Sequence, residues 1–270
     1  MASDLNAASQ GGTTAPALVA RSLTLSWDNG RSIVVRDISL TVASGEVVCI
    51  VGRSGCGKTT ILHALSGLTK PLEGRVLLHG EDVSGVPGRV SYMLQKDLLI
   101  PSKRIIDNVC LPLVIAGASK QEARAKAAPL FERFGLEGTE RQWPSQLSGG
   151  MRQRAAFLRT YLMGNDVALL DEPFSALDAI TRVDLRSWYC AMASELGMAS
   201  VVITHDVDEA VTMADRIYVL EGNPRAGIPT TLAGEVKVPR AEALASSDVD
   251  DFALTPEYVA VKRKVLELLG

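Results

Sequence analysis

The chain contains the loop Gly52-Arg53-Ser54-Gly55-Cys56-Gly57-Lys58-Thr59, which has the form G-x-x-x-x-G-K-T. It follows an apolar run, residues 47–51, with the composition of a buried strand, and Thr60 leads into a segment that can continue as a helix. The three glycines let the backbone wrap tightly, so that its N–H groups can point at phosphate oxygens. Lys58 adds a positive charge for the β- and γ-phosphates, and Thr59 adds a hydroxyl for Mg²⁺. A chance glycine-rich turn is the alternative, but the strand before the loop and the helix after it favour a nucleoside triphosphate site.

Composition limits the class of protein and its partners. The 270 residues are 47% hydrophobic and 22% charged, which suits one large domain or two modest ones. The net charge of -3 gives no electrostatic reason to expect nucleic acid as a partner. No apolar run approaches the ~20 residues that cross a bilayer, and residues 1–16 lack a secretory signal, so a disordered tail is expected there. The four cysteines form no C-x-x-C pair, which favours a reducing cytosol over disulfides or zinc.

Strand and helix patterns alternate along most of the chain. Residues 18–27 and 32–42 indicate two antiparallel strands joined by a turn. Residues 96–164 are largely helical, which suggests a separate subdomain inserted into the fold. Further segments then alternate between strand and helix: 166–171, 179–196, 199–203, 207–214 and 216–220, the last expected as the final core strand. We therefore predict an α/β fold with a mostly parallel core sheet, an antiparallel β part at the N-terminus and an all-helical subdomain.

Polar side chains are expected where the core strands end. Ligands of parallel sheets bind at the carboxyl ends of strands, and five residues should meet there: Lys58, Gln95, Asp171, Glu172 and His205. Asp171 ends a buried strand, and a buried carboxylate needs a partner such as Mg²⁺ on a bound triphosphate. Glu172 could orient and deprotonate a water in line with the γ-phosphorus. The position of His205 at a strand end favours a role at the phosphates, whereas Gln95 taken alone could equally be structural.

A second helix start with a serine and two glycines occurs at Leu147-Ser148-Gly149-Gly150. Such a helix N-terminus can also bind phosphate. It lies on the helical insert, and the chain already has one phosphate loop. The simplest interpretation is that it serves the nucleotide of another copy, so that two chains close head to tail around two triphosphates as an isologous dimer.

In order and spacing, these segments resemble the ATP-binding subunit of an ABC transporter, over residues 17–235. The loop 52–59 corresponds to the family's Walker A motif, Gln95 to its Q-loop and residues 147–150 to its signature motif. Residues 167–172 correspond to its Walker B strand, 175–178 to its D-loop and His205 to its H-loop. Met151 departs from the glutamine most common in the family, which should leave the phosphate contacts of Ser148 and the backbone intact.

The resemblance implies a P-loop NTPase fold of the ABC cassette type, with ATP and Mg²⁺ as ligands. It implies that Trp27 stacks on adenine, that His205 contacts the γ-phosphate and that Asp178 reaches across the dimer. It also implies that Gln95 contacts both Mg²⁺ and the attacking water. The resulting expectation places the nucleotide on Trp27 and residues 52–60, the metal ion on Thr59, Gln95 and Asp171, and the catalytic roles on Glu172, His205 and Gln95.

A finer resemblance is to the importer group for nitrate, sulfonate, taurine and thiamine precursors. It rests on the signature segment Leu-Ser-Gly-Gly-Met-Arg-Gln-Arg, on residues 97–101 after Gln95 and on the tail from residue 238 to residue 258. Ser102 departs from the tryptophan usual in that group. The resemblance implies an ATPase that works with a second copy of itself, two integral membrane permease subunits and a periplasmic or surface solute-binding protein. It implies a peripheral location on the cytoplasmic face of the inner membrane.

Two other functions stay open at this level. One is a soluble ABC ATPase that acts on a partner unrelated to transport, although the chain shows no second cassette, coiled coil or zinc module. The other is a metabolite kinase with a P-loop, which would leave residues 147–150 unexplained. The C-terminal extension, 236–270, is expected to begin as a polar linker and to end in a helix at 259–269 that docks on the main domain.

Overall fold

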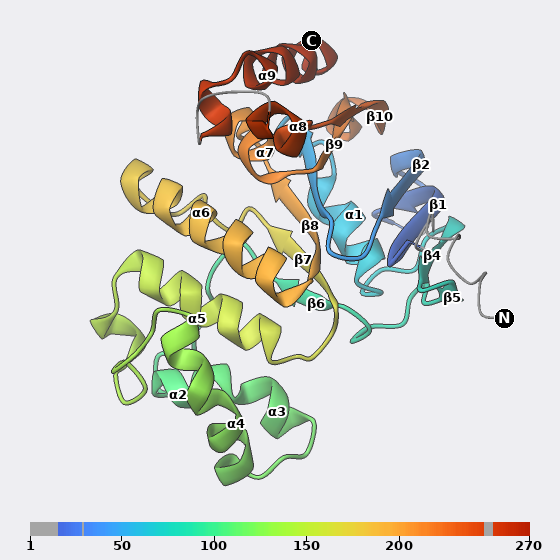
Figure 1. The fold of residues 1–270 in the computed structure, drawn as a ribbon. Coiled ribbons are helices and arrows are strands. Elements are labelled where there is room, and N and C mark those ends of the chain that lie inside the picture. Colours follow the sequence, from blue (N-terminus) through green and yellow to red (C-terminus); the bar gives the residue numbers. More distant parts are fainter. Residues whose placement is uncertain (1–15, 29, 246–250) are drawn as a thin grey trace, which may run out of the picture.

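The computed structural model describes residues 16–28, 30–245 and 251–270 (Figure 1). The expected tail, 1–16, lies outside the described residues except for Pro16. Within the described part, ten strands form one sheet in the order β5-β4-β1-β2-β10-β9-β3-β8-β7-β6. The strands are β1 Leu18–Ser26, β2 Ile33–Val42, β3 Val47–Gly52, β4 Glu73–Leu78, β5 Glu81–Asp82, β6 Ser91–Met93, β7 Val167–Asp171, β8 Ala199–Thr204, β9 Arg216–Asn223 and β10 Ile228–Lys237.

The sheet has a parallel part and an antiparallel part. In the parallel part, β3 pairs with β8 and β9, and β7 pairs with β6 and β8. In the antiparallel part, β1 pairs with β2 and with β4. β10 joins the two parts, because it is antiparallel to β9 and parallel to β2. The predicted α/β fold, with a mostly parallel core and an antiparallel N-terminal part, is confirmed.

The helices and short helical turns lie between and beside these strands (Figure 1). They are α1 Lys58–Leu65, α2 Ile105–Val109, α3 Leu111–Ile115, α4 Lys120–Arg133, η1 Pro144–Gln146, α5 Gly149–Tyr161, α6 Ala179–Leu196, α7 Val207–Met213, η2 Pro224–Ala226, α8 Arg240–Ala245, η3 Phe252–Leu254 and α9 Pro256–Leu269. Helices α2 to α5 form the expected helical subdomain, at the opposite end of the molecule from α9 (Figure 1).

Alternate side chains of β3 enter two separate hydrophobic cores. Val47, Cys49 and Val51 lie in the core that includes α5, α6 and α7. Val48 and Ile50 lie in the core that includes α1 and the antiparallel strands. This period of two follows from the pleat of a strand that is buried on both faces. The helix α1, which begins inside the phosphate loop, packs into the second of these cores through Ile61, Leu62 and Leu65.

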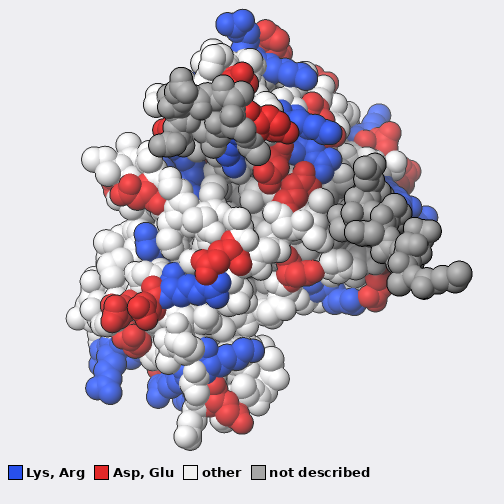
Figure 2. Space-filling view, in the orientation of Figure 1, with Lys and Arg blue, Asp and Glu red and all other residues white. Residues whose placement is uncertain are grey.

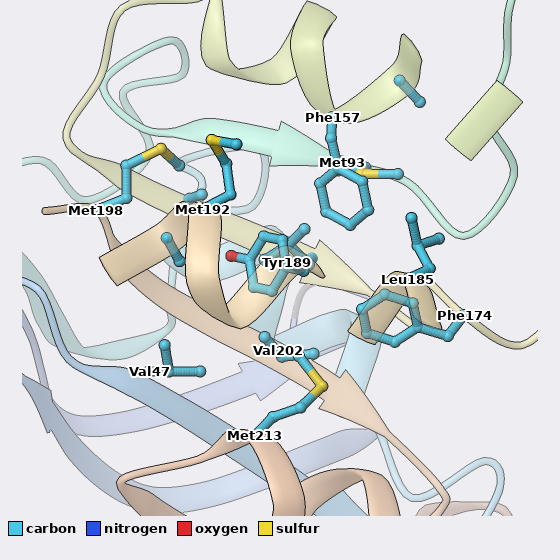
Figure 3. Packing of buried hydrophobic residues seen from close by; sticks show 14 of the residues in the cluster. Val47, Met93, Phe157, Phe174, Leu185, Tyr189, Met192, Met198, Val202 and Met213 are labelled. Atoms are coloured by element: carbon cyan, nitrogen blue, oxygen red, sulfur yellow. The ribbon is translucent and has the colours of Figure 1, made fainter. Parts of the chain in front are cut away.

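Aromatic packing attaches the helical subdomain to the core. The ring centroid of Phe157, on α5, lies 4.9 Å from that of Tyr189 on α6 and 6.1 Å from that of Phe174 (Figure 3). Phe174 follows the end of β7 by three residues and is fully buried. The packing of the subdomain therefore extends to the segment that carries the carboxylates of Asp171 and Glu172.

The structure differs from the sequence prediction at strand β10. The segment 216–220 was expected as the final core strand, but β9 continues to Asn223 and β10 follows it. β10 reads Ile-Pro-Thr-Thr-Leu-Ala-Gly-Glu-Val-Lys, which has neither an apolar run nor a clear alternation. Its pairing with β9, rather than its own pattern, makes it a strand, and it crosses the expected domain boundary at 235/236.

The C-terminal helix docks on the main domain, as expected. Thr255 caps α9 by accepting a hydrogen bond from the N–H of Tyr258 at 3.3 Å. Val261 and Val265 are buried, and α9 contacts α7, β9 and β10. The helix begins at Pro256, three residues before the predicted start.

The surface carries both signs of charge. Figure 2 shows acidic and basic side chains interspersed on the face that it draws. Among the described residues, no helix combines the length and the apolar character needed to cross a membrane.

Candidate nucleotide site

The phosphate loop, defined here as residues 52–59, connects β3 to α1. Gly57 has φ 99°, and a Cβ at this position would lie 2.9 Å from Cγ1 of Val34, so both conformation and space require glycine. The Lys58 side chain is buried, and its Nζ donates to the carbonyl oxygens of Gly52 at 2.8 Å and Arg53 at 3.1 Å. The loop thus wraps around its own lysine and presents the N-terminus of α1 to a ligand.

Thr59 and Asp171 bring the start of α1 to the end of β7. Oγ1 of Thr59 donates to Oδ2 of Asp171 at 2.9 Å, and Asp171 is 6% exposed. Burial raises the pKa of Asp171, the nearby Glu172 carboxylate raises it further, and the hydrogen bond from Thr59 opposes the rise. Burial also raises the pKa of the Tyr92 phenol, and the nearby carboxylate of Asp171 raises it further. A hydroxyl and a desolvated carboxylate are oxygen ligands that fit Mg²⁺, together with phosphate and water.

Glu172 contacts two of the other predicted site residues. Its Oε2 accepts a hydrogen bond from Nε2 of Gln95 at 3.3 Å and lies 3.2 Å from Nδ1 of His205. The backbone of Glu172 has φ 45°, a left-handed conformation that costs a non-glycine residue about 1–3 kcal/mol. Its N–H donates to the carbonyl oxygen of Ile203 at 3.0 Å, which holds this conformation against β8. Three side chains that are distant in sequence therefore meet beside the phosphate loop.

A cavity of about 540 Å³ lies between these side chains and the phosphate loop. Its lining includes Arg53, Glu172 and His205, together with the C-terminal residues Leu269 and Gly270. The Arg53 guanidinium donates through Nη2 to the carbonyl oxygens of Leu269 at 3.2 Å and Gly270 at 2.7 Å. The sequence analysis did not anticipate that α9 would end at the candidate site.

Trp27 directly follows β1 and lies next to the start of α1. Its side chain is 54% exposed, and its Nε1 donates to Oγ1 of Thr60 at 3.4 Å. An exposed indole held next to the phosphate loop can offer a flat face to a base.

The signature motif forms a second group of residues with the D-loop, defined here as residues 175–178. Ser148 caps α5 by accepting from the N–H of Met151 at 3.3 Å, and Leu147 before it is buried. A Cβ at Gly149 would lie 3.1 Å from Cδ2 of Leu177, and one at Gly150 would lie 2.9 Å from Cγ2 of Thr181. Asp178 caps α6 and accepts from the N–H of Thr181 at 3.0 Å. The two glycines therefore let α5 approach the D-loop and the first turn of α6 closely.

Side chains of α5 reach two other parts of the site that the sequence analysis did not name as functional. The buried amide of Gln153 donates to the carbonyl oxygen of Pro173, directly after Glu172. Arg159 donates to the carbonyl oxygens of Asp97 and, at 2.8 Å, of Leu98. A glutamine on the buried side of an otherwise amphipathic helix was the available signal for Gln153. The contacts of Arg159 depend on the path of the loop after Gln95.

The phosphate loop lies between β3 and α1, and β7, which is two positions from β3 in the sheet, ends at the carboxylates of Asp171 and Glu172. This arrangement defines a P-loop ATPase. Residues 35–175, more than half of the chain, match the family model described as ABC transporter. The chain belongs to the ABC transporter family, and it binds and hydrolyses ATP.

Similar proteins include importer subunits and solved cassettes. The formylaminopyrimidine import ATP-binding protein ThiZ of Halalkalibacterium halodurans is 41% identical over 77% of this chain and 79% of its own length. The taurine import ATP-binding protein TauB of Pseudomonas aeruginosa is 39% identical over 77% of this chain and 80% of its own length. The dimeric structure of MJ0796, a bacterial ABC transporter cassette, superimposes with a TM-score of 0.69 at 28% identity, covering 82% of this chain and 98% of that one.

Proposed function

We propose that this chain is the motor subunit of an importer that takes up a small polar or charged solute. The similarity to import proteins for a formylaminopyrimidine and for taurine supports this role. It also supports a solute of the nitrate, sulfonate, taurine or thiamine-precursor type. The solute itself would be selected by other chains of the transporter.

The working assembly contains two copies of this chain, which agrees with the dimeric state of the MJ0796 cassette. Two integral membrane permease subunits and a periplasmic or surface solute-binding protein complete it. The chain would bind the permeases peripherally, on the cytoplasmic face of the inner membrane. Residues 17–235 form the ATPase domain in this proposal, with the helical subdomain at about 96–164, and residues 236–270 form an extension that shares strand β10 with it.

The chemistry is assigned to the residues that meet at the phosphate loop. Trp27 stacks on the adenine, and residues 52–60 hold the phosphates. Glu172 orients the attacking water and accepts its proton, because its carboxylate is the group held between Gln95 and His205. His205 contacts the γ-phosphate from the end of β8.

The Mg²⁺ ligands are assigned to Thr59, Asp171 and Gln95. The hydroxyl of Thr59 already contacts the Asp171 carboxylate, and the Gln95 amide reaches Glu172 through its nitrogen. When bound, Mg²⁺ would neutralise charge on the phosphate oxygens. It would also offset the desolvation that raises the pKa of Asp171.

One observation carries this proposal: the predicted residues fall into two separate groups. Gln95, Glu172 and His205 meet at the phosphate loop, whereas Ser148, Gly149 and Gly150 lie against the D-loop and the start of α6. A second copy that presents its signature motif and Asp178 would complete the first group. This division supports a composite site over a kinase active site contained in one chain.

The catalytic assignment is tested with Glu172→Gln and Ser148→Arg. We expect Glu172→Gln to bind ATP, to release phosphate very slowly and to accumulate as a closed dimer in size-exclusion chromatography. Ser148→Arg should abolish hydrolysis, because a bulky cation replaces the phosphate-facing hydroxyl. Glu195→Gln, at an exposed position on α6 where the carboxylate pairs with Arg133 of α4, is the control. Rapid phosphate release by Glu172→Gln would show that Glu172 is not the general base. Full activity of Ser148→Arg would support a kinase-like site contained in one chain.

The importer assignment is tested by purifying the tagged chain from detergent-solubilised native membranes. We expect a multi-span membrane protein to co-elute, and mass spectrometry identifies it. If only soluble partners co-elute, the chain is instead a soluble ABC ATPase, and the transport role is wrong.

A further inference from the structure

Arg182 lies on the first turn of α6 and contacts the D-loop. Its side chain is 31% exposed. Nη2 donates to the carbonyl oxygen of Leu177 at 3.0 Å, inside the D-loop. A hydrogen bond from a charged guanidinium to a carbonyl is stronger than one between neutral groups. Arg182 therefore holds the D-loop backbone directly before Asp178.

The other side of the same guanidinium faces the segment after His205. Nη1 lies 3.7 Å from Oδ2 of Asp206, and Nε lies 3.7 Å from Oε1 of Glu209. Of these two acidic residues, Glu209 is the more deeply buried, at 4% exposure. One side chain thus spans the gap between the D-loop and the junction of β8 and α7.

Both carboxylates are hydrogen-bonded within the segment 204–209, which contains His205. Oδ1 of Asp206 accepts from the N–H of Asp208 at 2.8 Å and of Glu209 at 3.1 Å, which caps α7. Oε2 of Glu209 accepts from Oγ1 of Thr204 at 2.6 Å, at the end of β8. His205 stands between Thr204 and Asp206, so the residues on both sides of it take part in this hydrogen-bond network.

The D-loop end of this connection continues to the signature motif. Leu177, whose carbonyl oxygen accepts from Arg182, packs on Gly149, and Thr181 packs on Gly150. A continuous series of contacts therefore runs from the signature motif, through the D-loop and Arg182, to His205 and its neighbour Glu172.

The ionic contacts of Arg182 are longer than hydrogen bonds in this structure. Its Nε is buried without a hydrogen-bond acceptor, although a buried carboxylate lies 3.7 Å away. A buried donor and a buried carboxylate both gain free energy when they approach to hydrogen-bond distance. The ion pair between Nε and Glu209 would therefore become stronger if the two atoms came closer together.

We propose that Arg182 is a positioning residue that couples the signature motif and D-loop of one chain to His205 of the same chain. In the closed dimer, Ser148 and Asp178 would act on the partner's nucleotide, and His205 would act on this chain's own nucleotide. Engagement of the first group would then set the position of the second. This inference rests on the composite site proposed above.

Three variants separate coupling from simple charge or stability effects. Arg182→Ala removes the link, Arg182→Lys keeps the charge, and Arg186→Ala removes the same charge one turn further along α6. Arg186 is the matched control because its charge also acts on Glu209 and its Nε is also buried without a hydrogen-bond partner. For each protein, phosphate release is measured against ATP concentration, ATP affinity is measured in the Glu172→Gln background, and the thermal unfolding midpoint is recorded.

We expect Arg182→Ala to lower kcat about 10-fold or more, because a small misplacement of a site residue can cost up to ~100-fold in rate. Its ATP affinity should stay near wild type, since no nucleotide ligand is removed. Arg182→Lys should recover part of kcat, and Arg186→Ala should keep most of it. The coupling is wrong if Arg182→Ala and Arg186→Ala lower kcat by the same factor. It is also wrong if Arg182→Ala loses affinity for ATP while its kcat stays unchanged.

The failure of this inference is distinct from the failure of the composite site. If Glu172→Gln and Ser148→Arg abolish turnover while Arg182→Ala keeps it, only the coupling is wrong. If Glu172→Gln itself keeps full turnover, the catalytic assignment is wrong and the coupling is wrong with it. If Arg182→Ala has a lowered unfolding midpoint, Arg182→Lys decides the question instead. An Arg182→Lys protein that unfolds at the wild-type midpoint but recovers none of the lost kcat would also overturn the proposal.

Discussion

Nη2 of Arg53 donates to the carbonyl oxygen of Gly270 at 2.7 Å, although 217 positions separate the two residues. The contact places the C-terminal end of α9 against the phosphate loop. Carbonyl groups at the end of a helix carry partial negative charge, which favours a guanidinium there. Lys262 of the same helix lies 2.6 Å from Asp208 on α7, so α9 is tied both to the phosphate loop and to the helix that follows His205.

Removal of Leu269 and Gly270 should raise the affinity for ATP. The deletion frees Arg53, while Val261 and Val265 keep α9 docked. A net hydrogen bond is worth about 0.5–1.5 kcal/mol, so we expect an increase of about 2- to 10-fold. Calorimetric titration with ATP in the Glu172→Gln background measures it, with Glu267→Ala on the exposed side of α9 as the control. Unchanged or weaker binding would show that the C-terminal contact does not compete with the nucleotide.

Replacement of Trp27 should weaken ATP binding in a way that a second aromatic residue restores. Stacking of a base on an aromatic side chain is worth about 1–3 kcal/mol, so we expect Trp27→Ala to raise the Kd for ATP by about 5- to 160-fold. Trp27→Phe should recover most of the affinity. Trp143→Phe is the control, since Trp143 packs against Arg104 at 3.8 Å in the helical subdomain. If Trp27→Ala binds ATP like wild type, the indole is not part of the base site.

Asp171→Asn should stabilise the nucleotide-free protein at neutral pH. The pKa of Asp171 is raised above its ordinary value of 3.8, chiefly by burial. A carboxyl with a raised folded-state pKa contributes stability below its unfolded pKa and loses that contribution as the pH rises through the folded pKa. Ionisation of Asp171 therefore opposes folding increasingly as the pH rises through the folded-state pKa, whereas asparagine carries no charge and can still accept the hydrogen bond from Thr59.

Thermal unfolding between pH 4 and pH 8 measures this effect. We expect the variant to melt a few degrees above wild type at pH 7, because about 1 kcal/mol moves the midpoint by ~2–4 °C in a chain of this size. The difference should shrink toward pH 4, and ATP with Mg²⁺ should reverse it, because the metal ligand Asp171 lets wild type bind Mg²⁺–ATP more tightly than the variant does. Asp184→Asn, at an exposed position on α6, is the control. A variant that melts below wild type at pH 7 would contradict the assigned cost of burial.

Gly150→Ala should impair the signature motif, and Thr181→Ser should compensate. The added Cβ would lie 2.9 Å from Cγ2 of Thr181, and serine lacks that methyl group. Overpacking costs about 1–3 kcal/mol, which exceeds the ~0.5–1 kcal/mol gained by replacing glycine inside a helix. We expect a lower unfolding midpoint and lower ATPase activity for Gly150→Ala, both partly recovered in the double variant. Equal defects in the single and double variants would rule out this contact as the reason for glycine.

The ATPase machinery could be recognised from the sequence because its signals are local. The phosphate loop is eight consecutive residues between a strand and a helix, and Asp171 and Glu172 directly follow an apolar run. The glycines that allow a tight turn and the apolar run that is typical of a buried strand are both features of consecutive residues, so these segments can be recognised before any tertiary contact is known. The convergence of Gln95, Glu172 and His205 was predictable for the same reason, since parallel strands bring their carboxyl ends to one edge.

The remaining features came only with the tertiary structure. β10 is a strand because β9 pairs with it, and α9 reaches Arg53 because Val261 and Val265 dock it on the domain. In the sequence, nothing distinguishes Arg182 from the other basic residues of its helix. Its hydrogen bond to Leu177 and its proximity to Glu209 are seen only in the folded structure. Polar side chains can form many alternative hydrogen bonds, so their pattern along the chain does not specify a partner. That partner is selected when distant backbone segments are packed at fixed distances by the hydrophobic cores.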